Sequence, residues 1–523
     1  MDTKGAAPRP GEAMFAAALA HHQAGQLDPA ADLYREVMAR AAGHVEARVN
    51  LGLVLQRQGA AKAALAAYDA ALALDPELAA VHNNRGVALQ TLGRFEAAAA
   101  SHQAAIALRP GSVDAHLNLG AALQRLGRFE AAAASCRTAL ALRSDHAGAH
   151  ANLGLALLAL DRPGEALGHH RAALSAAPDS PEFHSNLGLA LQALGDPSAA
   201  TAAFERAIAL RPAFAEGHTH LGVARLLTGD FAQGWRHYEW RLARTAIPQP
   251  IRPGRRWNGG NLAGKSVLLQ TEQGLGDAVQ FIRYAPMVAS RGGRVLVSCR
   301  PPLRRLFETV DGVAEMIDEA TPTPAFDCWA PLLSLPALFG TTQATIPAEV
   351  PYLRADPALI AAWGERLAGL NGQKKVGVAW RGSPDHPNDR SRSIAAVQFA
   401  RILSVSGLAV VSLQIDARAE ELDALGVAAF DAGPQLGDFA DTAALIANLD
   451  LVISVDTALA HLAGALGAPA WTLIGFAPDW RWLLGREDSP WYPSMRLFRQ
   501  PQLGDWDSVT AAVRDALARR AGA

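Results

Sequence analysis

The sequence is poor in cysteine, has almost no net charge and lacks a long apolar run. Its three cysteines, Cys136, Cys299 and Cys328, form no CxxC pattern, so neither a disulfide framework nor a zinc knuckle is supported. Lysine and arginine number 48 against 50 aspartates and glutamates, which leaves no overall field to attract nucleic acid or an anionic membrane. Polar residues break the alanine-rich stretches well short of a membrane span, and the N-terminal residues show no apolar signal segment. We therefore expect a cytoplasmic protein with reduced thiols, and its 523 residues predict several domains.

A period of 34 residues organises the first half of the chain. Each period reads as helix, turn and second helix, and the small glycine and alanine side chains let the two helices approach closely. The units resemble tetratricopeptide repeats, which predicts an α-solenoid of about seven repeats over residues 11–248, after a flexible N-terminus at 1–10. Residues 11–44 lack the glycine and are expected to be a degenerate cap. The recurring glycines are Gly52, Gly86, Gly120, Gly154, Gly188 and Gly222, and Pro76, Pro110, Pro178 and Pro212 close four units.

Two polar residue types keep the same period. We expect the histidines to pack between neighbouring helices and not to bind metal, because a ligand cluster would not need one histidine in every repeat. The asparagines leave two readings open: their amides hold repeats together, or they line a groove and bind the backbone of an extended peptide. The asparagine row resembles that of nucleocytoplasmic O-GlcNAc transferases, which favours peptide binding. The asparagines are Asn50, Asn84, Asn118, Asn152 and Asn186, and the histidines are His82, His116, His150, His184 and His218.

A proline-rich segment separates the repeats from the second half. We assign residues 249–262 to a linker, and a new domain begins near Ala263. The string from Gly259 to Ser266 fits the Walker A pattern, but a proline-rich linker precedes it and an apolar strand-like run follows it. A P-loop needs a strand before and a helix after, so that helix-terminal amides face the phosphates. We therefore reject a nucleotide hydrolase.

From residue 263 onward, short β-rich runs alternate with helical patterns. The runs are SVLLQT, RVLVSC and AEMID, and then KVGVAW, AVVSLQI, VAAFDA, LDLVISVD and PAWTLIG. The alternation predicts two Rossmann-like lobes, an N-terminal one at 263–346 and a C-terminal one at 374–523, joined by a connection at 347–373. The C-terminal lobe is expected to close with an amphipathic helix in DSVTAAVRDALARRA, residues 507–521. Ligands of such sheets bind beyond the carboxyl ends of the strands, so we expect a site in the cleft between the lobes.

Polar motifs follow the predicted strands. In the first lobe Gly274, Gly276 and Asp277 come after the run SVLLQT; the glycines would let backbone amides approach a ligand, and Asp277 either acts in the cleft or caps a helix. A dinucleotide fingerprint would need a glycine where Val279 stands, so a dehydrogenase is disfavoured. In the second lobe arginines suited to a diphosphate and residues suited to a nucleotide follow other strands. These candidates are Arg381, Arg390, Arg392, Gln414, Asp456, Thr457 and His461.

These motifs resemble the C-terminal domain of bacterial tetratricopeptide-repeat glycosyltransferases, itself similar to the heptosyltransferases of lipopolysaccharide synthesis. The matching segments are EQGLGDAVQFIRY, VGVAWRGSPDHPNDRSRS, LDLVISVDTALAHLAGALGAPAW and DWRWLLGREDSPWYPSMRLFRQ. The resemblance implies a GT-B fold, a nucleotide-sugar donor, inversion and no metal. It gives Asp277 the role of base, and it assigns the segment from Asp456 to His461 to the nucleotide and diphosphate of the donor. Relatives with this layout include flagellin-modifying enzymes, in which the repeats dock flagellin.

The sequence therefore predicts a glycosyltransferase that moves a sugar from a nucleotide sugar to flagellin or another bacterial protein docked on the repeats. No cofactor is expected beyond the nucleotide sugar as co-substrate, and the DxD-like Asp505 to Asp507 lies in the tail, so no metal is expected either. Trp480, Trp482, Trp491 and Tyr492 either stack on a sugar or, more in keeping with irregular loops, pack together. Two alternatives stay open: a non-catalytic scaffold with a degenerate transferase domain, and a transferase acting on lipopolysaccharide.

Overall fold

The computed structural model describes residues 10–244, 254–318, 324–384, 386 and 388–522. Residues 1–9 of the predicted N-terminus and 249–253 of the predicted linker lie outside this set. The chain divides into two compact units, residues 1–190 and 191–523. The division falls within the repeats, 58 residues before the boundary that the sequence suggests at residue 248.

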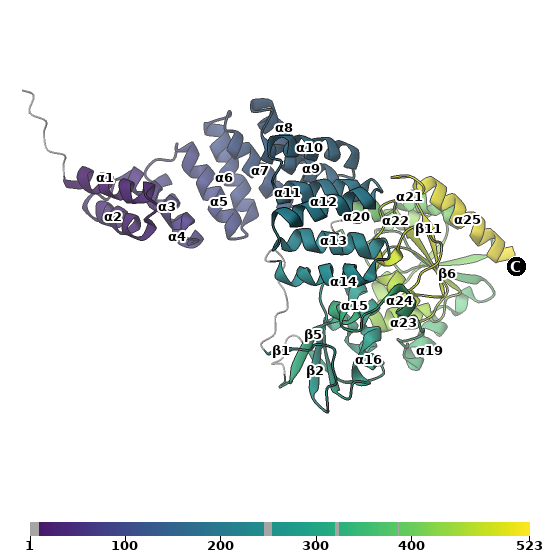
Figure 1. Cartoon of the computed structure of the whole chain (residues 1–523). Helices are drawn as coiled ribbons and strands as arrows, with labels where there is room; N and C mark the ends of the chain where they lie inside the picture. Colours follow the sequence, from purple (N-terminus) through teal and green to yellow (C-terminus); the bar gives the residue numbers. More distant parts are fainter. Residues whose placement is uncertain (1–9, 245–253, 319–323, 385, 387, 523) are drawn as a thin grey trace, which may run out of the picture. The chain divides into compact units, whose positions relative to one another are not determined.

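The described residues 10–238 form seven helix pairs, which confirms the α-solenoid of tetratricopeptide repeats. The helices of each unit stack pair after pair (Figure 1). The pairs are α1 (Pro10–Gln23) with α2 (Leu27–Arg40), α3 (Val45–Arg57) with α4 (Ala61–Leu72), α5 (Ala79–Thr91) with α6 (Phe95–Leu108), α7 (Val113–Arg125) with α8 (Phe129–Leu142), α9 (Ala147–Ala159) with α10 (Pro163–Ala176), α11 (Pro181–Ala193) with α12 (Pro197–Leu210), and α13 (Ala215–Leu227) with α14 (Phe231–Tyr238).

The periodic glycines sit where the paired helices touch. A Cβ atom on Gly52 would lie 2.4 Å from the ring of Tyr68, and one on Gly154 would lie 2.3 Å from the ring of His170. Since carbon atoms do not approach this closely, a side chain at these positions would push the helices apart. The steric reason inferred from the 34-residue period is therefore confirmed.

The periodic histidines bind backbone carbonyls, and two of them also pack against the next helix, as expected: His150 against His169 and His218 against His237. Each ring Nε2 lies at hydrogen-bond distance from the carbonyl oxygen six residues earlier, so it ties the start of one helix to the end of the preceding repeat. The distances are 2.9 Å for His82 to Pro76, 3.0 Å for His116 to Pro110, 2.9 Å for His150 to Ser144, 2.9 Å for His184 to Pro178 and 2.9 Å for His218 to Pro212.

Two parallel sheets form the second half, which confirms the predicted pair of α/β lobes. In the first sheet the strand order is β1-β5-β2-β3-β4, and in the second it is β11-β10-β9-β6-β7-β8. The first sheet contains β1 (Arg255–Arg256), β2 (Ser266–Gln270), β3 (Arg294–Cys299), β4 (Val313–Asp318) and β5 (Cys328–Pro331). The second contains β6 (Lys374–Ala379), β7 (Leu408–Ser412), β8 (Ala429–Asp431), β9 (Leu451–Val455), β10 (Ala470–Ile474) and β11 (Met495–Arg499). Because β2 begins at Ser266, the Walker A-like string leads into a strand, as its rejection requires.

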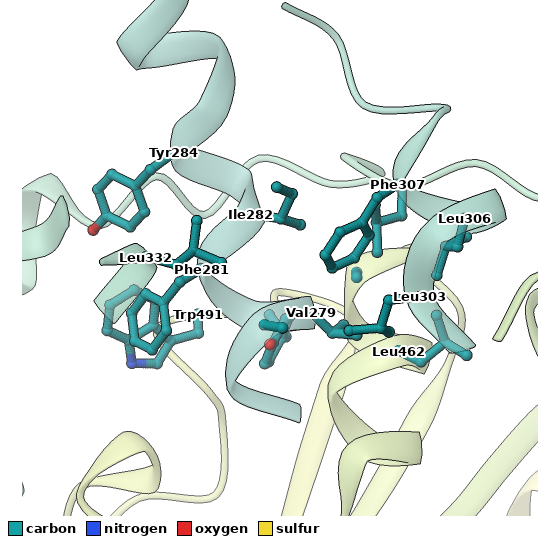
Figure 2. Packing of buried hydrophobic residues seen from close by; sticks show 14 of the residues in the cluster. Val279, Phe281, Ile282, Tyr284, Leu303, Leu306, Phe307, Leu332, Leu462 and Trp491 are labelled. Carbon is teal, nitrogen blue, oxygen red and sulfur yellow. The ribbon is translucent and has the colours of Figure 1, made fainter. Parts of the chain in front are cut away.

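Helices connect and flank these strands. Helices that line the cleft include α15 (Leu275–Phe281), α20 (Asp389–Arg392), α23 (Phe439–Ile446) and α24 (Ala458–Ala465). The first lobe also contains η2 (Ile282–Tyr284) and α17 (Arg304–Phe307). The segment between the lobes carries α19 (Pro357–Arg366), and α25 (Trp506–Gly522) is the closing helix that the sequence predicts. Apolar side chains of α15, η2 and α17 gather with Leu462 of α24 and Trp491, so one core spans both lobes (Figure 2).

The last repeat belongs to this same core. Leu226, Phe231, Trp235 and Tyr238 are buried together with residues of the first lobe. The indole Nε1 of Trp235 donates a hydrogen bond of 2.9 Å to the carbonyl of Thr341. The repeat that ends the solenoid is therefore packed into the α/β half and does not merely precede it.

Candidate active site

A cavity of about 660 Å³ lies between the two lobes, at the carboxyl ends of their strands. The first lobe contributes Gly274 to Asp277 after β2, and Arg300 after β3. The second lobe contributes residues that follow β6, β7, β9 and β10. Nine of the ten residues predicted for catalysis or donor binding line it: Asp277, Gly274, Gly276, Arg381, Arg392, Gln414, Asp456, Thr457 and His461. Arg390 does not; it is exposed on α20.

Asp277 is both a helix cap and a cavity residue. One carboxylate oxygen, Oδ2, accepts a hydrogen bond of 2.8 Å from the amide of Gly274, at the start of α15. The other, Oδ1, forms an ion pair with Arg481. Its side chain keeps 17% exposure, so the carboxylate is fixed in direction and still reaches the cavity. The side chain of Asp277 therefore does both things that the sequence left open: it caps α15 and it lines the cleft.

Arg481 is the main residue that sequence reasoning missed. Its side chain is 8% exposed, and its guanidinium binds Asp277, Asp479 at 2.8 Å and Gln280 Oε1 at 2.6 Å while lying over the ring of Trp480. It therefore fixes the carboxylate from the first lobe against the second. The signal was available in the string DWRWLL, where an arginine among tryptophans is expected to be buried and to need a carboxylate partner.

The two glycines of the first lobe serve packing more than ligand approach. A Cβ on Gly276 would lie 2.9 Å from His461 Cδ2 and 3.2 Å from the Cα of Ala458, so a glycine lets α15 pack directly against α24 of the other lobe. The amide of Gly274 is already used by Asp277. The expectation that these glycines expose amides to a ligand is therefore not met at Gly274.

The segment after β9 lines the cavity with two groups whose pKa values are shifted, Asp456 and His461. Burial raises the pKa of the Asp456 carboxyl to about 6, and repulsion from Asp479 adds to the effect. The imidazole of His461 stacks on Trp482, and its Nδ1 lies 2.9 Å from the hydroxyl of Tyr492. Burial and nearby arginines hold the pKa of His461 well below its usual value, so it is uncharged at neutral pH. It can offer a hydrogen bond to a phosphate but not a positive charge.

The arginines expected to bind phosphate differ in how free they are. The guanidinium of Arg381 is occupied by Asp416 at 2.7 Å and Glu421 at 3.1 Å, and its backbone amide donates to Gln414 Oε1 at 3.3 Å. Arg392 donates to the backbone carbonyl of Asp456 at 3.0 Å and reaches the cavity beside the start of α24. Arg300 is exposed at the end of β3 and lines the same cavity. Arg392 and Arg300 are thus the better placed cations.

The aromatic residues proposed for either stacking or packing are packed. Trp480, Trp482, Trp491 and Tyr492 are all buried, and none of them lines the cavity. Asp507 of the DxD-like string pairs with Arg401 at 2.6 Å, away from the cavity. Within the part of the chain that the structure describes, no group of three or more His, Cys, Asp or Glu side chains is arranged to hold a metal ion.

The asparagine row of the first unit is half-buried and largely unused. Among the described residues, the side-chain amides of Asn50, Asn84, Asn152 and Asn186 have no hydrogen-bond partner, while Asn118 donates to Asn83 at 3.1 Å. Glutamines fix the backbone of this row instead: Gln90 donates to the carbonyl of Asn118 at 2.8 Å, and Gln124 donates to that of Asn152 at 2.7 Å. Four of the five amides therefore keep free donors and acceptors, on backbone that belongs to helices α3, α5, α9 and α11.

Comparisons with known proteins agree with this architecture. Residues 83–145, 117–181, 58–93 and 181–214 match models of the tetratricopeptide repeat, and residues 431–504 match that of glycosyltransferase family 9 (heptosyltransferase). The chain combines tetratricopeptide repeats with a glycosyltransferase family 9 domain. The family 9 segment contains Asp456, Thr457, His461 and Arg481, and so forms one wall of the cavity.

A curated relative and solved structures are similar to parts of the chain. Protein FlbA of Caulobacter vibrioides is 35% identical over 313 residues, which cover 54% of this chain and 52% of FlbA. The chain thus matches about half of the length of that relative. A tetratricopeptide repeat protein from Parabacteroides merdae aligns at 17% identity over 44% of this chain and 91% of its own, with a TM-score of 0.40. YrrB, a TPR protein with an unusual peptide-binding site, aligns at 20% identity over 36% of this chain and 96% of its own, with a TM-score of 0.31.

None of the helices in the described ranges is both long and apolar enough to cross a membrane. The cytoplasmic location stays a prediction.

Proposed function

We propose that the chain is an inverting, metal-independent glycosyltransferase of the GT-B type, which moves a sugar from a nucleotide-sugar donor to a protein bound along the repeats. The observation that carries the proposal is the cavity between the lobes, because it gathers Asp277 from one lobe and the family 9 segment from the other. The nucleotide sugar is a co-substrate, and no further cofactor is proposed.

In the proposed reaction an acceptor hydroxyl attacks the anomeric carbon of the donor. Asp277 takes the hydroxyl proton as the new oxygen–carbon bond forms and the bond from the anomeric carbon to the phosphate oxygen breaks. The departing nucleoside diphosphate gains negative charge, which Arg392 and the N-terminus of α24 would stabilise. His461, uncharged, would donate one hydrogen bond there. Arg481 holds the Asp277 carboxylate in line with the cavity.

The unused amides of Asn50, Asn84, Asn152 and Asn186 support a protein acceptor. A row of amides repeated every 34 residues can bind backbone groups of an extended chain with little regard to its side chains. Flagellin is the first acceptor to test, because the layout of repeats and transferase resembles that of flagellin-modifying enzymes.

Incubation with a panel of nucleotide sugars and candidate proteins, followed by intact mass measurement, tests the proposal. We expect a mass shift of one sugar, and we expect Asp277→Asn to lower turnover by about 100- to 10,000-fold, as is typical for loss of a general base. Asp311→Asn, a matched control at an exposed carboxylate of the first lobe, should leave turnover unchanged. A folded chain with neither transfer nor donor hydrolysis across the panel would count against the enzyme and favour the scaffold.

The acceptor class needs a separate variant. Replacing Asn50, Asn84, Asn152 and Asn186 by alanine together leaves the helix contacts in place and removes only the amides. Transfer to protein should then fall while donor hydrolysis stays the same. If the variant transfers as well as the wild-type chain, and transfers to lipopolysaccharide, the asparagine row is not the acceptor site.

A further inference from the structure

The end of the solenoid is ion-paired to the loop between β2 and α15, which leads to the proposed base Asp277. After α14 the chain forms a short 3-10 helix, η1 (Glu239–Ala243), in which Arg241 is 2% exposed. Its guanidinium reaches Glu272 in the loop between β2 and α15, with Nη2 2.6 Å from Oε1 and Nε 3.3 Å from Oε2. Glu272 is buried as well, at 3% side-chain exposure. A residue of the repeats is thus paired with a residue five positions before Asp277.

A buried ion pair is a costly way to join two surfaces unless its geometry matters. Here the guanidinium is satisfied on several sides: it also contacts Glu239 at 2.6 Å and the hydroxyl of Ser334 at 2.8 Å. Two parallel N–H donors to one carboxylate fix both the position and the orientation of that carboxylate. Glu272 is therefore held in one place by the repeat.

The next residue of the loop is held by the same repeat. Gln273 has a positive φ of 60°, a conformation that non-glycine residues adopt only when their surroundings impose it. The hydroxyl of Tyr238, at the end of α14, donates to Gln273 Oε1 at 3.3 Å. Directly afterwards the amide of Gly274 binds Asp277 Oδ2. The path from the repeat to the carboxylate is continuous over Glu272, Gln273 and Gly274.

We propose that Arg241 is a positioning residue for the transferase: it fixes the loop from Glu272 to Asp277 so that the carboxylate faces the cavity. This role rests on the proposed function for its effect on turnover. The claim that Arg241 orders the loop does not rest on the proposed function, because the order of the loop can be measured directly. Thr271, Gly274 and Ala278 have hydrogen-bonded amides, which makes their hydrogen exchange a measure of loop order.

The test uses the full chain with Arg241→Met, Arg241→Lys and the double change Arg241→Met with Glu272→Met. The double variant removes both charges and so avoids an unpaired buried carboxylate if the single variant fails to fold. We expect amide exchange over residues 271–278 to rise about tenfold. We expect kcat to fall about 10- to 100-fold with the donor KM within about threefold, and lysine to restore part of the loss.

Trp235→Phe is the matched control. It removes a buried hydrogen bond between the same repeat and the first lobe but keeps an aromatic ring against Tyr238 and Trp480, so exchange over 271–278 and kcat should stay near wild type. Wild-type exchange in a folded double variant would overturn the proposal, and so would wild-type kcat in an active chain. If the wild-type chain turns over no donor, the proposed function fails, while the exchange measurement still decides whether Arg241 orders the loop.

Discussion

The same 34-residue period runs through both units of the chain, but the repeats have different neighbours in each. In residues 1–190 the core is built largely from alanine and leucine of adjacent repeats. In residues 191–523 the last repeat buries Phe231, Trp235 and Tyr238 in a core that it shares with the α/β lobes. The pair Leu65 and Trp235, which occupy the same position five repeats apart, shows the change. A repeat is therefore a separable element only where its neighbours are other repeats.

The tryptophans of the chain allow the unfolding of the two units to be followed separately. All eleven tryptophans lie in residues 191–523 and none in residues 1–190. Tryptophan fluorescence therefore follows the second unit alone, whereas helical circular dichroism follows both. Transitions seen by the two probes should not coincide if the units unfold separately.

The largest effect is expected from truncation. A chain that starts at Pro181 keeps α11 to α14 and should fold, with cooperative loss of tryptophan fluorescence on heating. A chain that starts at residue 249 loses Leu226, Phe231, Trp235 and Tyr238 from the shared core. Each such side chain contributes about 3 kcal/mol, and together they rival the whole stability of a typical domain. This chain should aggregate or unfold, as yield and melting curves would show.

That truncation also bears on the acceptor. Removing all the repeats would unfold the transferase whatever its acceptor is, so loss of activity in a chain lacking residues 11–248 would say nothing about docking. Stable folding of the chain that starts at residue 249 would contradict the shared core.

The next effect compares equivalent sites in the two units. Trp235→Ala should cost about 3–5 kcal/mol, because it empties a large buried site and removes the bond to Thr341. Leu65→Ala, at the same repeat position, should cost about 2–3 kcal/mol. The first should shift the fluorescence transition in urea, and the second should shift only the dichroism. A fluorescence shift with Leu65→Ala would mean that the units unfold together.

Much of this arrangement follows from sequence alone, and the rest fails for identifiable reasons. The 34-residue period, the strands β2 to β4 and β6 to β10 and the closing helix were predicted, because each is set by local patterns of apolar residues. The strands β1, β5 and β11 were not: Arg255–Arg256 and CWAP are short, and MRLFR lies between Pro493 and Pro501. The cavity residues were found because they follow strands. Partners such as Arg481 and Arg241 were missed because they lie hundreds or tens of residues away in sequence.

A smaller effect is expected when a glycine at a helix contact is replaced by alanine, and turnover should distinguish Gly276 in the second unit from Gly154 in the first. Gly276→Ala places a methyl 2.9 Å from His461 Cδ2 and 3.2 Å from the backbone of Ala458, so it should cost about 1–3 kcal/mol and also lower turnover by moving α15 away from α24. Gly154→Ala meets the ring of His170 at 2.3 Å and should cost a similar amount without changing turnover. Urea midpoints and donor hydrolysis measure the two effects. Equal turnover in both variants would show that the contact between α15 and α24 is not needed for catalysis.

The smallest effect is a gain in stability in the first unit. His170 is fully buried, and both of its ring nitrogens lack a hydrogen-bond partner among the described residues. Phe204 fills the equivalent site of the next repeat, so His170→Phe should fit there. Removing the unsatisfied nitrogens should stabilise the first unit by about 1–2 kcal/mol, seen by dichroism and not by fluorescence. His102→Phe should gain less, because His102 Nδ1 lies 2.9 Å from Asn83 Oδ1 and that contact would be lost.

The pH dependence of the same variant has a definite sign. Burial lowers the pKa of His170 from 6.5 to about 4, with repulsion from His169 adding to it. Below pH 6.5 the unfolded chain takes up a proton that the folded chain does not, so stability is lost as the pH falls from about 6.5 towards 4. His170→Phe should make this loss shallower by about 1.4 kcal/mol per pH unit. Urea midpoints followed by dichroism across that range measure the slope, and parallel slopes for variant and wild type would show that the ring is protonated in the folded chain.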